Sequence, residues 1–172
     1  MPAPFDQSRK ARSACFTGHR PRMLTNCRLD DLRLDLHIAI QEAVDAGYQY
    51  FYCGMAMGSD IIAGELVLAL REQFPEIKLI CVAPFDAQTD GWPEEWRQRY
   101  YRLRDAADEK VSLMPVRFSE GYLVRNRYMV DHSSLLIGVY NGTPWGGTAY
   151  TVRYARSQGL KIRLITPAAY RK

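Results

Sequence analysis

Three glycines lie within eleven residues of the stretch YFYCGMAMGSDIIAGELVLAL, at Gly54, Gly58 and Gly64. The first two stand where an apolar run should turn into a helix. Glycine is unfavourable at such a place unless the backbone bends sharply or another group comes very close. The amino terminus of a helix offers unpaired N–H groups and a partial positive charge, and glycine lets a phosphate approach them. The stretch therefore predicts that an anion, in particular a nucleotide phosphate, binds close to Gly54 and Gly58.

Two further segments support an anion site because they are also glycine-bearing turns after apolar runs. They are TGHRP at 17–21 and NGTPWGGT at 141–148. One glycine loop alone would indicate plain turn chemistry, but two loops together with the TGHRP turn favour a phosphate site. The pattern is not the G-x-G-x-x-G dinucleotide fingerprint, and no acidic residue is suitably placed at the end of the second apolar run, so a conventional NAD site is not expected.

Several polar and aromatic residues near these turns have two interpretations each. Ser59 and Asp60 either cap the helix that follows or contact the ligand. His19 and Arg20 could contact a phosphate or a base of the ligand. Alternatively, His19 packs inside the protein and Arg20 pairs with a surface carboxylate. Phe85 follows a third apolar run, where it either stacks on a base or belongs to a small core under a long loop.

The elements that must position these residues alternate between strands and helices. Short apolar runs predict strands at 14–18, 48–53, 77–83, 110–115, 133–140 and 161–166. Amphipathic or apolar segments predict helices at 29–46, 59–73, 93–108, 121–131 and 147–158. This alternation predicts an α/β fold, a Rossmann-like open and mainly parallel sheet with helices on both faces. Ligands of such folds bind outside the carboxyl ends of the strands, which is where the glycine turns lie.

Composition restricts the class of protein. The chain has 172 residues, is 47% hydrophobic and 24% charged, and carries a formal net charge of +4, which fits one globular domain and disfavours a nucleic-acid site. Four scattered cysteines and three histidines predict reduced, packed thiols and no metal site. We expect a disordered lead-in at 1–11, a single domain at 12–172, no membrane span and a cytoplasmic location.

Five segments resemble a known bacterial family, in the order CFTGHRP, GMAMGSD, APFDAQTDGW, YLVRNRYMVDHSSLLIGVYNG and GGTAYTVRYA. They are similar to the YpsA and YoqJ proteins, bacterial proteins of unknown function in the SLOG superfamily. Other branches of that superfamily are the DNA-processing protein DprA and the lonely-guy (LOG) phosphoribohydrolases. The resemblance covers about residues 12–166, and it implies a Rossmann-like fold with a pocket for a nucleotide or nucleotide-derived ligand.

The resemblance and the turn analysis together give the residues expected at the ligand. These are Thr17, Gly18, His19, Arg20, Gly54, Gly58, Ser59, Asp60, Phe85, Arg125, Asn126, Gly146, Gly147 and Thr148. Arg125 falls where LOG enzymes have their active-site arginine. A guanidinium there could grip a phosphate with two parallel hydrogen bonds, whereas the alternative is a structural pair at the protein rim with Asp131 or Glu120.

One departure from the LOG pattern bears on activity. LOG enzymes follow their second glycine loop with a catalytic glutamate pair, but here Thr148 is followed by Ala149, Tyr150 and Thr151. Hydrolysis of an N-glycosidic bond normally needs such carboxylates. We therefore expect a sensor or regulatory protein that binds a small nucleotide-like molecule. The alternatives are an enzyme acting on a nucleotide-derived substrate and a DprA-like nucleic-acid-binding module, and a homo-oligomer stays open.

Overall fold

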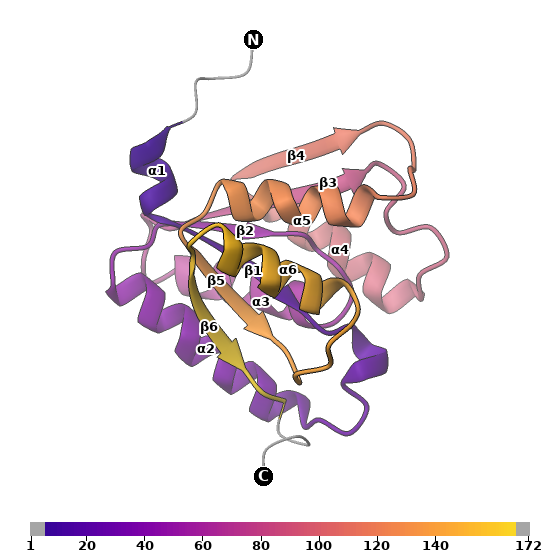
Figure 1. The fold of residues 1–172 in the computed structure, drawn as a ribbon, viewed down its shortest axis with the longest axis horizontal. Coiled ribbons are helices and arrows are strands. Elements are labelled where there is room, and N and C mark those ends of the chain that lie inside the picture. The colour runs from indigo at the N-terminus through magenta and orange to yellow at the C-terminus, as the bar shows by residue number, and fades with distance from the viewer. Residues whose placement is uncertain (1–5, 168–172) are drawn as a thin grey trace.

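The computed structural model describes residues 6–167 and contains one open sheet of six parallel strands (Figure 1). The strands are β1 (Ser13–Gly18), β2 (Tyr50–Cys53), β3 (Lys78–Phe85), β4 (Glu109–Met114), β5 (Leu135–Val139) and β6 (Lys161–Ile165). The α-helices are α1 (Gln7–Ala11), α2 (Leu29–Asp45), α3 (Ser59–Arg71), α4 (Glu94–Ala106), α5 (Gly121–Asp131) and α6 (Gly147–Ser157). The predicted parallel α/β architecture is confirmed.

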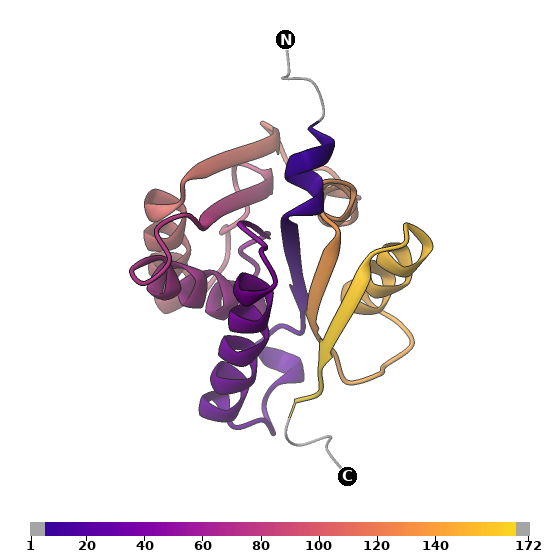
Figure 2. The same ribbon diagram turned by 90° about the vertical axis from the view of Figure 1, so that its left-hand side faces the viewer.

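Helices cover both faces of the sheet (Figure 2). α2, α3 and α4 pack on one face, and α5 and α6 pack on the other. Successive residues of a strand point to opposite faces, so each central strand must be apolar throughout. In β1, Phe16 belongs to the core under α2 to α4, whereas its neighbour Cys15 belongs to the core under α5 and α6. In β2, Phe51 and Tyr52 divide in the same way.

The direction in which successive strands are added to the sheet reverses next to β1. The sheet runs β4-β3-β2-β1-β5-β6, so the chain builds outward from β1 to β4 and then returns to add β5 on the other side of β1. The connections after β1 and β5 therefore leave the sheet toward opposite faces, and a crevice opens between them at the carboxyl ends of the strands. This geometry predicts where a ligand would bind before any side chain is considered.

Within the segment 1–11, which was expected to be a disordered lead-in, the structure has the short helix α1 at Gln7–Ala11. The Asp6 carboxylate accepts hydrogen bonds from the backbone N–H groups of Ser8 (2.9 Å) and Arg9 (3.2 Å), which caps the helix. The Arg9 guanidinium then forms two hydrogen bonds with Glu109 of β4 (2.9 and 2.7 Å) and lies 4.3 Å above the Tyr50 ring. Residues 1–5 lie outside the described part of the chain.

The described residues also bear on membranes, metals and thiols. No helix between residues 6 and 167 combines the length and apolar character that crossing a bilayer requires. Within the same residues, no three His, Cys, Asp or Glu side chains gather as a metal site would need. All four cysteines are free thiols, and those at positions 15, 53 and 81 are buried.

Gly64 lets helices α3 and α4 pack closely, which gives a stability prediction. A Cβ atom at this position would lie 2.8 Å from Cδ2 of Leu103 and 3.2 Å from Sγ of Cys53. Valine has a better helix propensity than glycine, but the overpacking should dominate. We expect Gly64→Val to lower the free energy of unfolding by about 1–3 kcal/mol in urea titrations.

The control for this variant is Ala69→Val, which places the same side chain on an exposed position of α3. It should cost less than about 1 kcal/mol, the difference in helix propensity between the two residues. A Gly64→Val protein as stable as the native chain would contradict the close packing of α3 against α4.

Candidate functional site

A cavity of about 760 Å³ opens at the carboxyl edge of the sheet, in the crevice beside β1. This volume is in the usual range for a site that takes a small organic ligand. The cavity is formed by the segments that follow β1, β2 and β5 and by the amino-terminal parts of α3, α4, α5 and α6. Its lining residues are Thr17, Gly18, His19, Arg20, Pro21, Arg22, Met23, Ala56, Met57, Asp60, Pro93, Trp96, Tyr122, Leu123, Arg125, Asn126, Thr143, Trp145, Gly146, Gly147 and Thr148.

His19 joins the turn after β1 to the turn after β5. Its backbone N–H donates to the carbonyl of Val139 (3.1 Å), and its Nε2 accepts the backbone N–H of Asn141 (3.0 Å). Burial lowers the pKa of the imidazole, and a ring nitrogen that accepts an N–H cannot itself carry a proton. His19 is therefore a neutral side chain that holds two site loops together while lining the cavity.

Two arginines follow His19 at the mouth of the cavity. Arg20 and Arg22 are both exposed; Arg20 directly precedes the short 3₁₀ turn Pro21–Met23, and Arg22 is the middle residue of that turn. The Arg20 guanidinium lies 5.0 Å from the centre of the Tyr122 ring, an arrangement that orients the group by a cation–π contact. These guanidinium groups give one side of the mouth a positive charge.

Arg125 explains why residue 54 is a glycine. The Nη1 of this guanidinium donates to the carbonyl oxygen of Gly54 (2.5 Å), and its Nε donates to the side-chain oxygen of Asn126 (2.8 Å). A Cβ on Gly54 would lie 2.6 Å from Cζ of Arg125, so any larger residue would displace the guanidinium. Arg125 is 2% exposed and lines the cavity, and neither Asp131 nor Glu120 pairs with it. The alternative of a pair at the protein rim is wrong.

Gly58 and Ser59 tie the start of α3 to the turn after β1. Gly58 has a φ of +92°, which disfavours other residues, and a Cβ there would lie 2.9 Å from the carbonyl oxygen of His19. The same oxygen accepts the Oγ–H (2.8 Å) and the backbone N–H (3.2 Å) of Ser59. The groups that come close to Gly54 and Gly58 therefore belong to the chain itself, and neither glycine lines the cavity.

Asp60 places a carboxyl in the cavity wall, in the first turn of α3. The residue is 5% exposed, and its Oδ2 accepts one long hydrogen bond from the N–H of Ala56 (3.4 Å). Its Oδ1 is buried and has no hydrogen-bond partner within residues 6–167. Burial raises the pKa of the Asp60 carboxyl to about 6, although the charge of Arg125 opposes the rise. A carboxyl with so few partners is unusual for a buried position.

The first turns of α3 and α6 differ in how their backbone N–H groups are used. In α3, the N–H groups of Ser59 and Ile61 already donate to the carbonyls of His19 (3.2 Å) and Ala56 (3.3 Å). In α6, the first backbone bond is that of Tyr150 to Gly146 (3.0 Å), and residues 147–149 find no N–H acceptor in the described part of the chain. The free donors at Gly147 and Thr148 line the cavity, so the helix end suited to an anion is that of α6.

Asn126 links Arg125 to α6. Its side-chain Nδ2 donates to Oγ1 of Thr151 (3.0 Å), whose hydroxyl donates to the carbonyl of Gly147 (2.8 Å). Ala149 and Thr151, which follow the second glycine loop, are each 1% exposed and pack inward. The residues after the second glycine loop thus have a structural role, because they form the buried side of α6 and its hydrogen bond to α5.

The structure brings ten of the fourteen expected site residues to the cavity wall. They are Thr17, Gly18, His19, Arg20, Asp60, Arg125, Asn126, Gly146, Gly147 and Thr148. Gly54, Gly58 and Ser59 lie directly behind this wall, where they contact Arg125 and His19. Phe85 does not line the cavity; its fully buried ring packs edge-on against the wall residue Tyr122 (5.5 Å between centroids).

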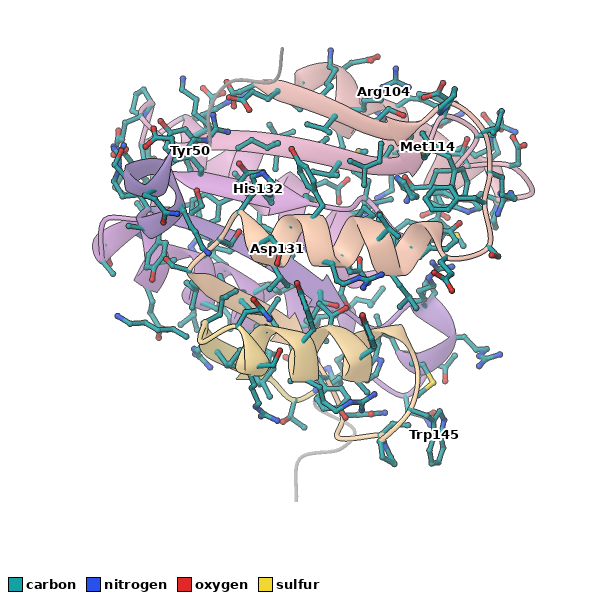
Figure 3. The ribbon with its side chains drawn as sticks, turned by 45° about the horizontal axis from the view of Figure 1, so that its top comes forward. Tyr50, Arg104, Met114, Asp131, His132 and Trp145 are labelled. Carbon is teal, nitrogen blue, oxygen red and sulfur yellow. The ribbon has the colours of Figure 1, made fainter. Side chains whose placement is uncertain are left out.

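Sequence reasoning missed several wall residues, among them Arg22, Tyr122 and Trp145. Tyr122 could have been found, since it lies three residues before Arg125 on the same helix and shares its face. Trp145 directly precedes the glycine pair and is 74% exposed; Figure 3 shows it at the tip of the loop before α6, pointing away from the sheet. These residues add an aromatic component to a site that the glycine turns indicated only as polar.

The sheet, its switch beside β1 and the crevice at the carboxyl edge define an open, Rossmann-like α/β protein. The sequence model of the YspA SLOG family matches residues 14–169, and the chain belongs to this family. A UPF0398 protein of Halalkalibacterium halodurans is 28% identical over 130 residues, covering 72% of this chain and 69% of the relative. A UPF0398 protein of Bacillus cereus strain G9842 is 25% identical over 150 residues, covering 83% and 82% respectively.

The raised pKa of Asp60 predicts how stability depends on pH. The folded carboxyl keeps its proton up to about pH 6, whereas the unfolded one loses it near the ordinary value of 3.8. Between these values the folded state binds more protons, so the free energy of unfolding falls as the pH rises. We expect native stability to fall by about 2–3 kcal/mol relative to Asp60→Asn between about pH 4 and pH 7, as measured by urea unfolding. A difference that does not change with pH would show that Asp60 ionises normally.

Proposed function

We propose that the protein binds a nucleotide or a nucleotide-derived molecule in this cavity and acts through that binding, as a sensor or regulatory protein. The observation that carries the proposal is the first turn of α6. Its N–H groups at Gly147 and Thr148 lack acceptors among residues 6–167, and they line the same cavity as three arginines. An anionic group such as a phosphate would satisfy these donors.

The other lining residues suit the remainder of a nucleotide. Trp96 and Tyr122 offer ring surface beside the polar groups, and Met23 and Met57 add apolar area. Aromatic side chains bind bases by stacking, which tolerates different bases because each has a π face. A cavity that combines anion-attracting groups with aromatic side chains fits a ligand that carries both a phosphate and a ring system.

The cavity offers less support for hydrolysis. Removal of a base requires stabilisation of an oxocarbenium-like centre and an activated water, which paired carboxylates normally provide. Asp60 is the one acidic side chain among the described residues of the wall, and it lies in α3. The segment after the second glycine loop, where the resemblance to LOG enzymes would place the glutamates, has Ala149, Tyr150 and Thr151 instead. Binding without turnover is therefore the function that the side chains favour.

The test is calorimetric titration of the purified chain with nucleoside mono-, di- and triphosphates, together with mass spectrometry of small molecules released on denaturation. Saturable binding of one class with a 1:1 stoichiometry would support the proposal. The same samples should be incubated with nucleoside monophosphates and assayed for free base. Repeated release of base would replace the sensor by the hydrolase, and no binding by any nucleotide would refute both.

Gly147→Val tests the α6 terminus. A Cβ at Gly147 meets no atom within 4 Å and its backbone needs no glycine, so valine should be accommodated and thermal unfolding should stay cooperative. The side chain would nevertheless occupy the space through which a phosphate reaches the N–H groups. We expect nucleotide affinity to fall by at least about tenfold, the loss of one hydrogen bond to a charged group. Ser157→Val, at the exposed far end of α6, is the control and should bind like the native chain.

Arg125→Lys tests the buried guanidinium. Lysine keeps the charge but loses the planar fork that reaches Gly54 and Asn126 while facing the cavity. We expect a loss of nucleotide affinity of about tenfold to a hundredfold, the typical range for a hydrogen bond to a charged group. The control is Arg127→Lys, the same change two residues along α5 and outside the cavity wall. Equal dissociation constants for both variants would remove Arg125 from the binding site.

A further inference from the structure

Asp60 is the least satisfied polar group in the cavity wall. Its one hydrogen bond is the long contact of Oδ2 with the N–H of Ala56 (3.4 Å), and Oδ1 lacks a partner within the described residues. Buried carboxylates usually accept several hydrogen bonds, because an unsatisfied one loses its hydration without compensation. No ion pair within 4.0 Å relieves it among residues 6–167, although the nearby Arg125 favours its charged form. A donor from the ligand would supply what the chain does not.

The cavity wall carries groups of both charges. Arg20, Arg22 and the first turn of α6 attract an anionic group. A phosphate in direct contact with the ionised Asp60 carboxyl would be repelled, whereas the charges of Arg125 and Arg20 both act on this carboxyl, so it lies close to cations that attract an anion. The part of the ligand that touches Asp60 is therefore an uncharged hydrogen-bond donor close to the phosphate.

We propose that Asp60 accepts a hydrogen bond from a sugar hydroxyl, so that the cavity selects ribonucleotides over deoxyribonucleotides. This inference rests on the proposed binding of a nucleotide and specifies its class. The sugar is the uncharged part of a nucleotide that is bonded directly to the phosphate, and its hydroxyls are donors. The base lies farther along the ligand, and Trp96 lines the same cavity.

The depth of the side chains supports the same assignment. Asp60 and Arg125 are 5% and 2% exposed, and they form the floor of the cavity, whereas Trp145 at its rim is 74% exposed. Arg125 donates a hydrogen bond to Asn126, Asn126 donates to Thr151, and Thr151 donates to the carbonyl of Gly147. Arg125 thus acts through its charge on the Asp60 carboxyl and is tied by hydrogen bonds to the first turn of α6, and a sugar next to a phosphate bound at that turn would lie in this part of the wall.

The discrimination follows from the environment of the carboxylate. A site built to pair with a hydroxyl rejects the analogue that lacks it, because the buried acceptor is then left unpaired. A hydrogen bond to a charged group corresponds to about tenfold to a hundredfold in affinity. This is the factor by which one deoxy analogue should bind more weakly than its ribonucleotide.

The experiment compares one nucleoside monophosphate with its 2′-deoxy and 3′-deoxy analogues by calorimetric titration at about pH 7.5, where Asp60 is ionised. The native chain should bind one of the two analogues about tenfold to a hundredfold more weakly. Asp60→Asn should bind the ribonucleotide as weakly as the native chain binds that analogue, and it should not distinguish the two. Asp105→Asn, which removes the same charge from an exposed position on α4, should keep the native preference.

Each result has a definite meaning. Equal binding of the ribonucleotide and both analogues by the native chain overturns the assignment of Asp60 while leaving nucleotide binding intact, and this holds even if Asp60→Asn does not fold. A preference for ribose that persists in Asp60→Asn also overturns it. Loss of the Asp60 effect with a base that lacks its exocyclic amino group would assign the donor to the base instead. Absence of binding by every nucleotide refutes the proposed function itself.

Discussion

The hydrogen bond between the Arg125 guanidinium and the carbonyl oxygen of Gly54 (2.5 Å) is the contact on which the site depends. It crosses the end of the sheet, because Gly54 follows β2 and Arg125 projects from α5, which covers the face opposite to α3. A buried guanidinium has many donors and must find acceptors. Glycine at position 54 makes one available at close range, and through this contact the turn before α3 and the helix α5 hold a common position.

A series of side-chain hydrogen bonds also connects Arg125 to α6. Asn126 accepts from the guanidinium and donates to Thr151, and Thr151 donates to Gly147. The three segments that stand out in the sequence, after β2, at α5 and after β5, are therefore joined by consecutive polar contacts. Because each contact is buried or partly buried, water competes with it weakly, and the positions of the wall residues are tightly coupled.

The sequence was sufficient for the fold because its signals are local. Continuous apolar runs such as 77–83 predict strands buried on both faces, and amphipathic spacing with a terminal glycine predicts helices such as 29–46. The helix at Gln7–Ala11 could not be predicted, because it is anchored by Glu109, about a hundred residues away in sequence. The glycine turns correctly indicated the edge of the sheet. Their spacing could not show that Gly54 faces an arginine of the chain itself, because that contact joins residues 71 positions apart.

The place of β1 in the sheet has a consequence for how the molecule assembles. β1 pairs with β2 on one side and with β5 on the other, and its partner on the β5 side lies roughly 120 residues later in the chain. Pairings of such long range form slowly, since a large loop must close first. A nascent chain can therefore complete the half from β1 to β4 while the other edge of β1 is still bare and open to wrong partners. The crevice forms only when β5 pairs with β1 and the start of α6 follows it into place, so the two sides of the cavity come together late in folding.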